Sequence, residues 1–421
     1  MTSPSDSPEV STESLAALAR QRGYVLFWIS RFIDILAAQA QAVTIAWQVY
    51  GMARAGGSSV QQAAFALGMI GLAQFLPLFA LTLIAGDTAD RHDRQRIIVI
   101  CIAVEVVCVG ALAAMTLTGA AAFWPIVGLA VVFGAARAFY NPASTALGPN
   151  LVPPVLLPRA IAWNSLAWQS AAIAGPALGG FLCAISPGVA YLVVGGLYLV
   201  SIGCIWTVRA LETRPPQTAS RIALMKEGLG YVWRQKIVFG SISLDLVAVL
   251  LGGATALLPV FARDILHVGA EGFGVLRASP ALGATVVAVW LAAHPVRRRA
   301  GLAMFAGVAA FGLATLVFAL SRSMILSVAA LAVLGAGDMV SVFVRQSLVQ
   351  IVTPDAMRGR VAAVSTLFIG ASNELGEFES GVAARILGPV GAAVFGGVGA
   401  LVATGLWAKL FPDLRKADKL T

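Results

Sequence analysis

The feature that most constrains the fold of this sequence is a succession of apolar runs, each about as long as a membrane-spanning helix. About 20 apolar residues in an α-helix cross the hydrocarbon core of a bilayer. Hydrophobic residues make up 59% of the sequence and charged residues only 12%, unlike a soluble domain. We therefore predict an all-α polytopic membrane protein with twelve transmembrane helices, at about residues 25–50, 62–85, 97–118, 123–146, 161–185, 188–208, 237–262, 271–293, 301–320, 324–349, 361–385 and 388–411.

One long polar connection divides these runs into two groups of six. It extends from Arg209 to Lys236 and includes a possible amphipathic segment, Ile222 to Trp233, whereas the other connections are mostly short. We predict five parts: an N-terminal tail (1–22), a six-helix bundle (23–209), a central linker (210–236), a second six-helix bundle (237–411) and a C-terminal tail (412–421).

The basic residues indicate how these helices are oriented. Most of the 29 lysine and arginine residues fall in segments on the same side as the N-terminus, and only Arg54, Arg263, Arg322 and Arg385 fall on the other. Because basic loops stay in the cytoplasm, we expect both termini and the linker to be cytoplasmic. The net charge of +9 is thus spread over short loops, which does not favour nucleic-acid binding.

The two halves of the chain resemble each other. Val152-Pro153-Pro154 corresponds to Val352-Thr353-Pro354, and each half has an aspartate in its first run, Asp34 and Asp245. Two related six-helix bundles enclose a cavity at their interface in many secondary transporters. We expect such a cavity to take a small-molecule substrate.

Charged residues inside the spans are the candidates for chemistry, because each costs about 2.5–3.5 kcal/mol at the bilayer centre. Asp34, Glu105, Arg137 and Asp245 lie at similar depth in their runs, roughly 12–15 Å from the cytoplasmic end at about 1.5 Å per residue. We expect Arg137 to pair with Glu105 or Asp34. These groups form either structural ion pairs, including Arg31 with Asp34 on one helix, or a site that binds and releases protons.

An acidic cluster, residues 372–381, lies near the middle of run eleven. Glu374 and Glu377 share a helical face, whereas Glu379 points elsewhere. This face should line a cavity, as a proton, cation or substrate site, or hydrogen-bond to neighbouring helices. Arg277, near the outer end of run eight, is expected to snorkel, and Asp338 and Arg345 share a face of run ten.

Two motifs remain. The stretch from Gly86 to Arg96 concentrates acids and arginines between two apolar runs, and Gly175-Pro176-Ala177-Leu178-Gly179-Gly180 combines small residues with a helix-bending proline. We find no phosphate-binding loop, no metal-ligand spacing among the cysteines and histidines, and no nucleophile triad. We therefore expect no enzyme activity, metal or cofactor.

With these residues in view, the chain resembles a major facilitator superfamily transporter over about residues 23–411. Gly86, Asp90, Arg91 and Arg94 match the superfamily's loop between helices two and three, although Asp93 and Gln95 depart from its pattern. The resemblance implies a gating latch, with Asp90 as its acid and Arg91 and Arg94 as its basic partners.

The other motif, Gly175, Pro176, Gly179 and Gly180, resembles the helix-five motif of drug/proton antiporters, and Arg137 falls near their helix-four arginine. Asn141-Pro142-Ala143, Leu151-Val152-Pro153, the segment Pro354 to Val361 and the segment Glu374 to Gly381 resemble the bacterial enterobactin-exporter-like branch. That branch implies export of siderophores or other hydrophobic compounds across the bacterial inner membrane.

The sequence thus favours a proton-coupled exporter that works by alternating access as a monomer. Asp34, Glu105, Arg137, Asp245, Glu374 and Glu377 are its predicted proton-coupling or substrate residues. Multidrug efflux and proton-coupled uptake are alternatives within the same fold, and a membrane enzyme or receptor is the alternative from another class.

Overall fold

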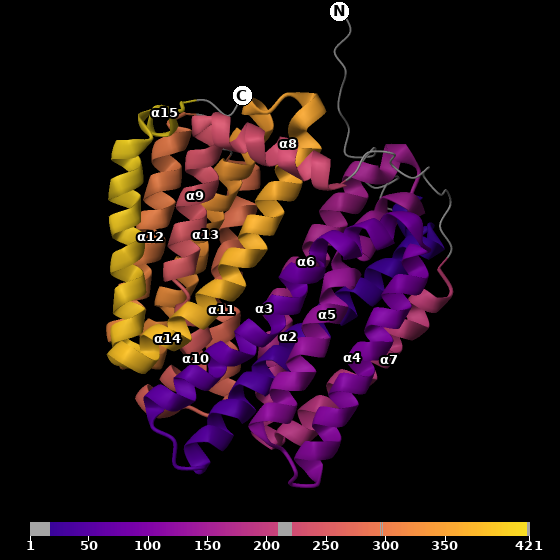
Figure 1. Ribbon diagram of the computed structural model, residues 1–421, viewed down its shortest axis with the longest axis vertical. Helices are drawn as coiled ribbons and strands as arrows, with labels where there is room; N and C mark the ends of the chain where they lie inside the picture. Colours follow the sequence, from indigo (N-terminus) through magenta and orange to yellow (C-terminus); the bar gives the residue numbers. More distant parts are fainter. Residues whose placement is uncertain (1–16, 209–220, 295, 297, 419–421) are drawn as a thin grey trace, which may run out of the picture.

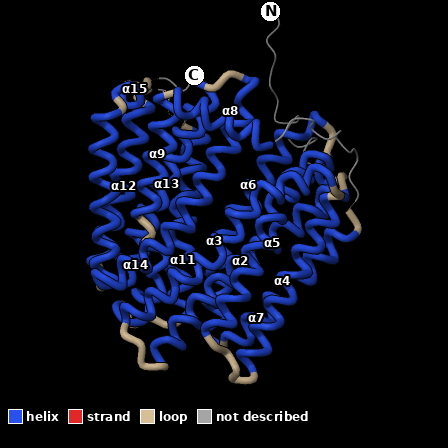
Figure 2. Tube along the Cα trace, viewed as in Figure 1, coloured by secondary structure: helices blue, strands red, loops and turns tan. Residues whose placement is uncertain are grey.

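The computed structural model describes residues 17–208, 221–294, 296 and 298–418; a few side chains within these ranges, that of Glu374 among them, are not described. Figure 2 shows that the described part consists of helices joined by loops and contains no strand. Within these ranges, eleven helices are long and apolar enough to cross a membrane. The predicted fold class is confirmed.

Six long helices form the N-terminal half, and short loops or 3-10 turns connect them. They are α2 (Arg22–Ala55), α3 (Val60–Arg91), α4 (Arg94–Leu117), α5 (Phe123–Leu147), α6 (Leu157–Ile185) and α7 (Pro187–Trp206). Ser59 begins α3 with a capping box and Asp93 caps α4, so polar residues fix where these helices start. Each helix overlaps one of the six runs predicted for this half, although α4 and α7 end slightly before their runs do.

The C-terminal half follows an amphipathic helix, α8 (Arg221–Arg234), within the predicted linker, of which residues 210–220 lie outside the described residues. Its later helices are α9 (Lys236–Leu251), α10 (Leu258–Val260), α11 (Ala270–Ala293), α12 (Ala300–Leu320), α13 (Met324–Val352), α14 (Asp355–Leu410) and α15 (Pro412–Arg415).

Two of these elements differ from the simple picture of one run per helix. The last two runs are joined in α14, which contains a kink at Gly388, where φ is 76°. Glycine reaches that left-handed region at little cost. The seventh run is broken after Leu251 by Gly252 and Gly253, and it continues through short turns into α10 and a π-helical turn, Phe261–Ile265.

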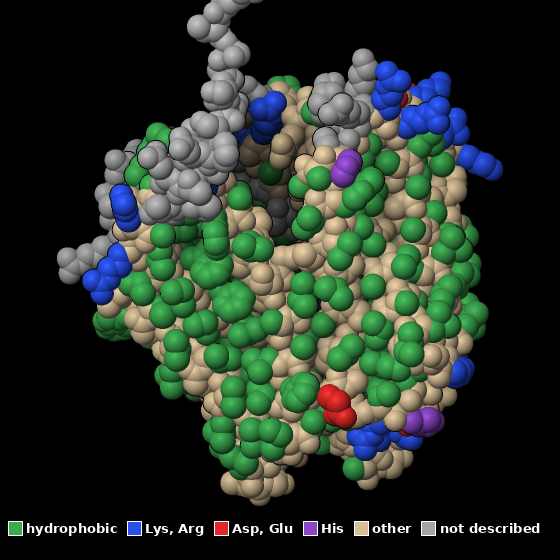
Figure 3. Space-filling model, turned by 180° about the vertical axis from the view of Figure 1, so that it is seen from behind, with side chains coloured by type: hydrophobic (Ala, Val, Ile, Leu, Met, Phe, Trp, Pro, Cys, Tyr) green, Lys and Arg blue, Asp and Glu red, His purple; other side chains and the backbone are tan. Residues whose placement is uncertain are grey.

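The two halves form the arms of a V (Figure 1). They contact each other chiefly along two helix pairs, α3 with α14 and α6 with α11. We call the open end, where α8 and α15 lie, the terminal face, and the opposite end the far face. Figure 3 shows a recess between the halves towards the terminal face and a broad apolar belt below it.

Candidate functional site

The most deeply buried charges of the N-terminal half meet at one arginine. Arg137 on α5 donates a hydrogen bond from Nη1 to Asp34 Oδ2 on α2 at 3.1 Å, and the same nitrogen lies 3.9 Å from Glu105 Oε1 on α4. Both carboxyl side chains are fully buried, and Arg137 is 23% exposed. The predicted pairing of Arg137 with Asp34 or Glu105 is confirmed, since it contacts both.

This cluster holds two acidic groups and one base, with few hydrogen bonds to satisfy them. Neither oxygen of Glu105 has a hydrogen-bond partner, and Oδ1 of Asp34 has none. Buried carboxylates normally accept several hydrogen bonds, and a buried unpaired charge is costly. A proton on one of the two carboxyl groups would balance the charge of the cluster.

Aromatic rings complete the surroundings of the arginine. The guanidinium carbon of Arg137 lies 5.5 Å from the centre of the Phe133 ring and 5.6 Å from that of the Tyr140 ring. Cation–π contacts of this length stabilise a buried cation. They hold the guanidinium near both acids, so a small rotation would exchange one acid for the other.

The alternative in which Arg31 forms a structural ion pair with Asp34 is wrong. It donates from Nη1 to Ser144 Oγ at 3.2 Å, and its Nε is buried without a hydrogen-bond partner. Asp34 is fully buried and directed to Arg137, whereas Arg31 lines the cavity between the halves. Residues i and i+3 share a face only approximately, and that offset separates the two groups.

The cavity has a volume of about 650 Å³ and is bounded by both halves of the chain. Its polar wall includes the guanidinium of Arg31 and three side-chain amides, and its apolar wall includes an indole ring. The residues concerned are Arg31, Asn164, Gln169 and Gln346, with Trp168, Met339 and Val342. Among its described lining residues there is no acid, and Asn164 Oδ1 is buried without a partner.

In the C-terminal half, Asp245 on α9 forms an ion pair with Arg345 on α13 at 3.3 Å, and both are buried. Glu377 lies elsewhere, 3.2 Å from Arg277 Nη2, and Arg277 also donates to the carbonyl of Thr255. Arg277 was expected to snorkel to the membrane surface; it instead pairs inward, because a carboxylate lies within reach. The side chain of Glu374 lies outside the described part of the structure.

The predicted residues therefore do not form one site. Asp34, Glu105 and Arg137 are brought together in the N-terminal half, and Asp245 and Glu377 belong to two different ion pairs of the C-terminal half. A small enclosed cavity lies beside the second of these pairs, between α2, α3, α11 and α14. It lies on the interface between the halves.

Sequence reasoning missed a polar contact between the halves at the far face. Tyr50 Oη on α2 donates a hydrogen bond to Asp264 Oδ2, and Arg54 Nη2 lies 3.4 Å from Asp264 Oδ1. The three residues were assigned to loops or span ends, and no signal in a single sequence joins positions more than two hundred residues apart. We call these residues the far-face lock.

Comparison with known proteins now identifies the chain. Residues 12–420 match the transmembrane secretion effector family. The chain belongs to that family of major facilitator superfamily transporters. It is therefore a secondary transporter with many membrane spans.

Curated relatives cover most of the chain. The multidrug efflux pump Tap of Mycobacterium tuberculosis is 26% identical over 92% of this chain and 93% of its own length. The enterobactin exporter EntS of Citrobacter koseri is 25% identical over 90% of this chain and 88% of its own length. Both are exporters by name.

Solved structures share the fold at low identity. A peptide transporter POT is 12% identical with a TM-score of 0.75, covering 94% of this chain and 96% of that chain. A bacterial homologue of the human lysosomal transporter Spinster, in an inward-facing and unoccupied conformation, is 14% identical with a TM-score of 0.70 over 94% and 96% of the two chains.

The superfamily's latch stretch differs from the expected loop. Gly86, Asp90 and Arg91 lie in the last turns of α3, and Arg94 begins α4, so only His92 and Asp93 lie between the helices. Arg91 pairs with Asp87 at 2.9 Å. Helix α3 persists because its polar end can extend beyond the bilayer as a helix, which satisfies its backbone groups.

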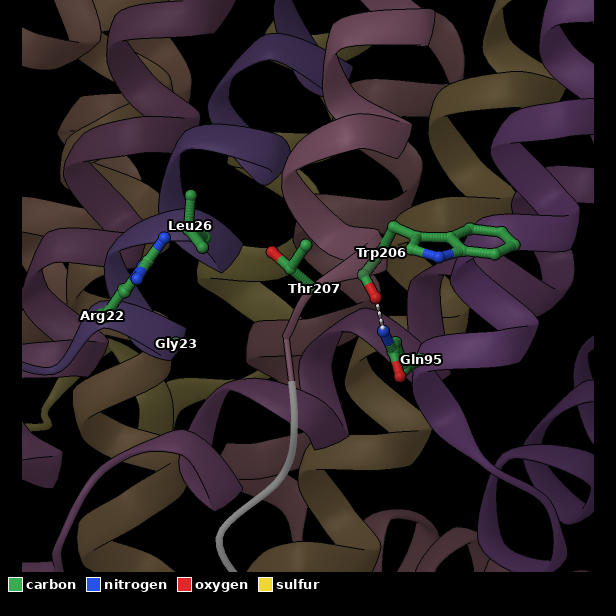
Figure 4. Close-up of a pocket in the computed structure, with 6 residues that line it drawn as sticks. All are labelled: Arg22, Gly23, Leu26, Gln95, Trp206 and Thr207. Atoms are coloured by element: carbon green, nitrogen blue, oxygen red, sulfur yellow. Dashed lines mark hydrogen bonds between the residues drawn. The ribbon is translucent and has the colours of Figure 1, made fainter.

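Two side chains of this stretch cap other helices. Arg94 Nη1 donates to the carbonyl of Ala146 at the end of α5, which accords with the capping role that the resemblance implies. Gln95, which departs from the superfamily pattern, donates to the carbonyls of Ile205 and Trp206 at the end of α7. Figure 4 shows Gln95 beside a pocket that Arg22, Gly23 and Leu26 of α2 share with Trp206 and Thr207.

The helix-five motif lets α6 approach two helices at once. Gly175, Pro176, Gly179 and Gly180 all lie in α6 and are buried. A Cβ on Gly179 would lie 2.7 Å from the carbonyl oxygen of Ala40 on α2, and one on Gly180 would lie 2.6 Å from that of Ala270 on α11. The motif therefore joins the two halves, because Gly180 meets Gly274 across the interface.

Proposed function

We propose that this transporter is a proton-coupled exporter of a hydrophobic small molecule rich in hydrogen-bond acceptors, such as a siderophore. The observation that carries the proposal is the buried cluster of Asp34, Glu105 and Arg137, with two acids for one base. Protonation of one acid leaves the cluster neutral, and loss of that proton leaves it negative. Such a change is expensive in low dielectric, so it can drive a conformational change.

The cavity supports this substrate class over a cationic drug. Arg31 has no carboxylate partner among the described residues, and Asn164, Gln169 and Gln346 add amide groups. An unpaired guanidinium attracts carboxylates, phenolates and other acceptors and repels cations. Trp168 and the aliphatic side chains would cover the apolar part of the ligand. Multidrug efflux, by analogy with Tap, is the second candidate, which the shared family favours.

The proposed orientation has both termini in the cytoplasm, which follows from the distribution of basic residues. On that basis the cavity opens to the cytoplasm and the far-face lock closes the outer end. A substrate would enter from the cytoplasm, and the halves would then rock to open the opposite end. Both halves that bound the cavity belong to the same chain, so we propose that a monomer can carry out the cycle.

The test uses everted membrane vesicles from a pump-deficient bacterial host, with enterobactin and ethidium as probes. Respiration acidifies the vesicle lumen, and a fluorescent pH probe reports proton loss when a substrate is exchanged. We expect enterobactin, more than ethidium, to discharge the gradient with the wild-type protein. No discharge with either probe would contradict proton-coupled export of these classes.

The matched variants are Glu105→Gln and Glu271→Gln. Gln at position 105 cannot release a proton, so active efflux should be lost, while exchange of labelled for unlabelled enterobactin across the membrane continues. Glu271 is exposed at the start of α11, and its variant should behave as the wild type. Active efflux that survives Glu105→Gln would exclude Glu105 from coupling.

A further inference from the structure

A second cluster of two acids and one arginine lies in the C-terminal half. Asp245 Oδ2 lies 3.3 Å from Arg345 Nη2, and the two side chains are 5% and 2% exposed. Asp338 lies two turns before Arg345 on the same face of α13, so the charges of Arg345 and of its partner Asp245 both act on it. The charged groups of this cluster therefore contain the same excess of one acid as the N-terminal cluster.

The two clusters occupy corresponding helices of the two halves. In each half an aspartate of the first helix pairs with an arginine of the fourth, Asp34 with Arg137 at 3.1 Å and Asp245 with Arg345 at 3.3 Å. The additional acid comes from a different place, Glu105 on α4 in one half and Asp338 on α13 in the other. Each half thus has two acids for one arginine, although the second acid comes from a different helix of the bundle.

Unsatisfied polar atoms point to a ligand in this second cluster. Ser341 Oγ and Arg345 Nε are both buried and have no hydrogen-bond partner. Asp338, Ser341 and Arg345 are spaced by three and four residues, so they share one face of α13. A proton on either carboxyl group would remove the excess charge and supply a donor.

The charged groups on neighbouring elements do not neutralise this excess. Helix α12 has no charged residue. Several charged residues on α8, α9, α11, α14 and α15 have other partners or are exposed. Glu227 pairs with Arg360, Arg277 pairs with Glu377, and Arg358 donates to the carbonyl of Gln350. The exposed residues are Lys236, Asp413 and Arg415. Glu379 lies beside Ser380, and the side chain of Glu374 is not described.

The cluster lies directly behind the wall of the substrate cavity. Met339, Val342 and Gln346 line that cavity, and each follows by one residue a member of the polar face formed by Asp338, Ser341 and Arg345. Neighbouring positions on a helix are about 100° apart, so a rotation of α13 of that order would bring the polar face to the cavity. A substrate pressing on α13 could therefore change access to the cluster.

We propose that Asp245, Asp338 and Arg345 form a second proton-binding site, which holds one exchangeable proton at neutral pH. The proton lies on one of the two carboxyl groups and leaves through the cavity when α13 rotates. Only its part in transport rests on the proposed function; the binding of the proton does not. With the N-terminal cluster, the transporter would carry two protons in each cycle.

Infrared difference spectroscopy of the full-length protein in lipid bilayers tests this site, because a protonated carboxyl group has its own carbonyl band. We expect Asp338→Asn and Asp245→Asn each to remove one carboxyl equivalent from that band at neutral pH, since each leaves one acid for one arginine. Arg345→Gln should instead add one equivalent, because two acids then lack a base. The exposed Glu271→Gln should change nothing.

The outcomes separate this inference from the proposed function. Loss of band intensity in Glu105→Gln but not in Asp245→Asn or Asp338→Asn would overturn the second site and leave the first. Loss of band intensity in the two aspartate variants but not in Glu105→Gln would support the second site and overturn the first. Unfolding exposes carboxyl groups to water, where they ionise at neutral pH, so it would weaken the carbonyl band. A stronger band in Arg345→Gln therefore cannot come from unfolding. That variant keeps the test decisive if an aspartate variant is unstable.

Discussion

At the scale of single residues, the charge that the cavity presents decides which substrates it can hold. Arg31 is the cation of the cavity wall, and its guanidinium donates a hydrogen bond to the hydroxyl of Ser144. Hydrogen bonds to a charged group are worth about 1.5–3 kcal/mol. Arg31→Gln should therefore raise the KM for enterobactin roughly tenfold to hundredfold, measured as concentration-dependent efflux in everted vesicles.

Two control variants show whether the raised KM for enterobactin comes from the loss of charge. Arg31→Lys keeps the cation and should recover part of the affinity, whereas Ser144→Ala removes only the support of the guanidinium and should have a smaller effect. Efflux of the cation ethidium should not weaken in Arg31→Gln, because no attraction is lost. If Arg31→Gln weakened enterobactin and ethidium efflux equally, the residue would act on the fold of the cavity and not on its charge.

At the scale of helices, the contact between α6 and α11 depends on the absence of side chains. A Cβ on Gly180 would lie 2.7 Å from the Cα of Gly274, closer than such atoms approach. Gly180→Leu should separate the two helices, at a cost of about 1–3 kcal/mol typical of overpacked contacts, and should disfavour closure at the far face.

The separation can be measured by electron spin resonance between labels at Ala184 on α6 and Glu271 on α11, in a variant without native cysteines. Both positions are exposed and lie near the far ends of their helices. Gly196→Ala on α7 is the control, because a Cβ there meets nothing within 4 Å. Equal label distances in Gly180→Leu and the control would show that this contact does not keep the halves together.

The helices are also the scale at which sequence reasoning succeeded. Length and hydropathy predicted the spans, because a bilayer requires a long apolar helix. The break after Leu251 and the kink at Gly388 were not predicted, although a glycine pair or a glycine–proline pair marks each position. Helix ends were displaced because polar turns such as the last turns of α3 remain helical beyond the apolar run.

The contacts of the site could be predicted only where the depth of the charged residues in the membrane was enough to pair them. Similar depth was enough to pair Arg137 with Asp34 and Glu105. It could not separate Arg31 from Asp34, or find Arg277 for Glu377, because those outcomes depend on how each helix is rotated about its axis. A single sequence carries no direct record of that rotation when a helix is apolar on nearly every face.

At the scale of the whole molecule, the far-face lock holds the two halves together. Tyr50 and Arg54 on α2 contact Asp264, which follows α10 in the other half. Alternating access requires this contact to break, whichever substrate is carried. A hydrogen bond to a charged group is worth about 1.5–3 kcal/mol, so Tyr50→Phe, which removes one, should raise the population open at the far face roughly tenfold to hundredfold. Asp264→Asn, which removes the charge from both contacts, should shift the population in the same direction.

Cysteine labelling from either side of the membrane measures that population and also tests the proposed orientation of the molecule. A single cysteine introduced at Gln346 lies in the cavity wall, and a membrane-impermeant maleimide can reach it only from the open side. In the wild-type background it should react in everted vesicles and little in right-side-out vesicles, since the cavity opens at the terminal face. Asp264→Asn should increase the reaction in right-side-out vesicles, because the halves then part at the far face. Reaction from the same side in both backgrounds would mean that the lock does not govern access, and reaction of the wild type only in right-side-out vesicles would reverse the orientation.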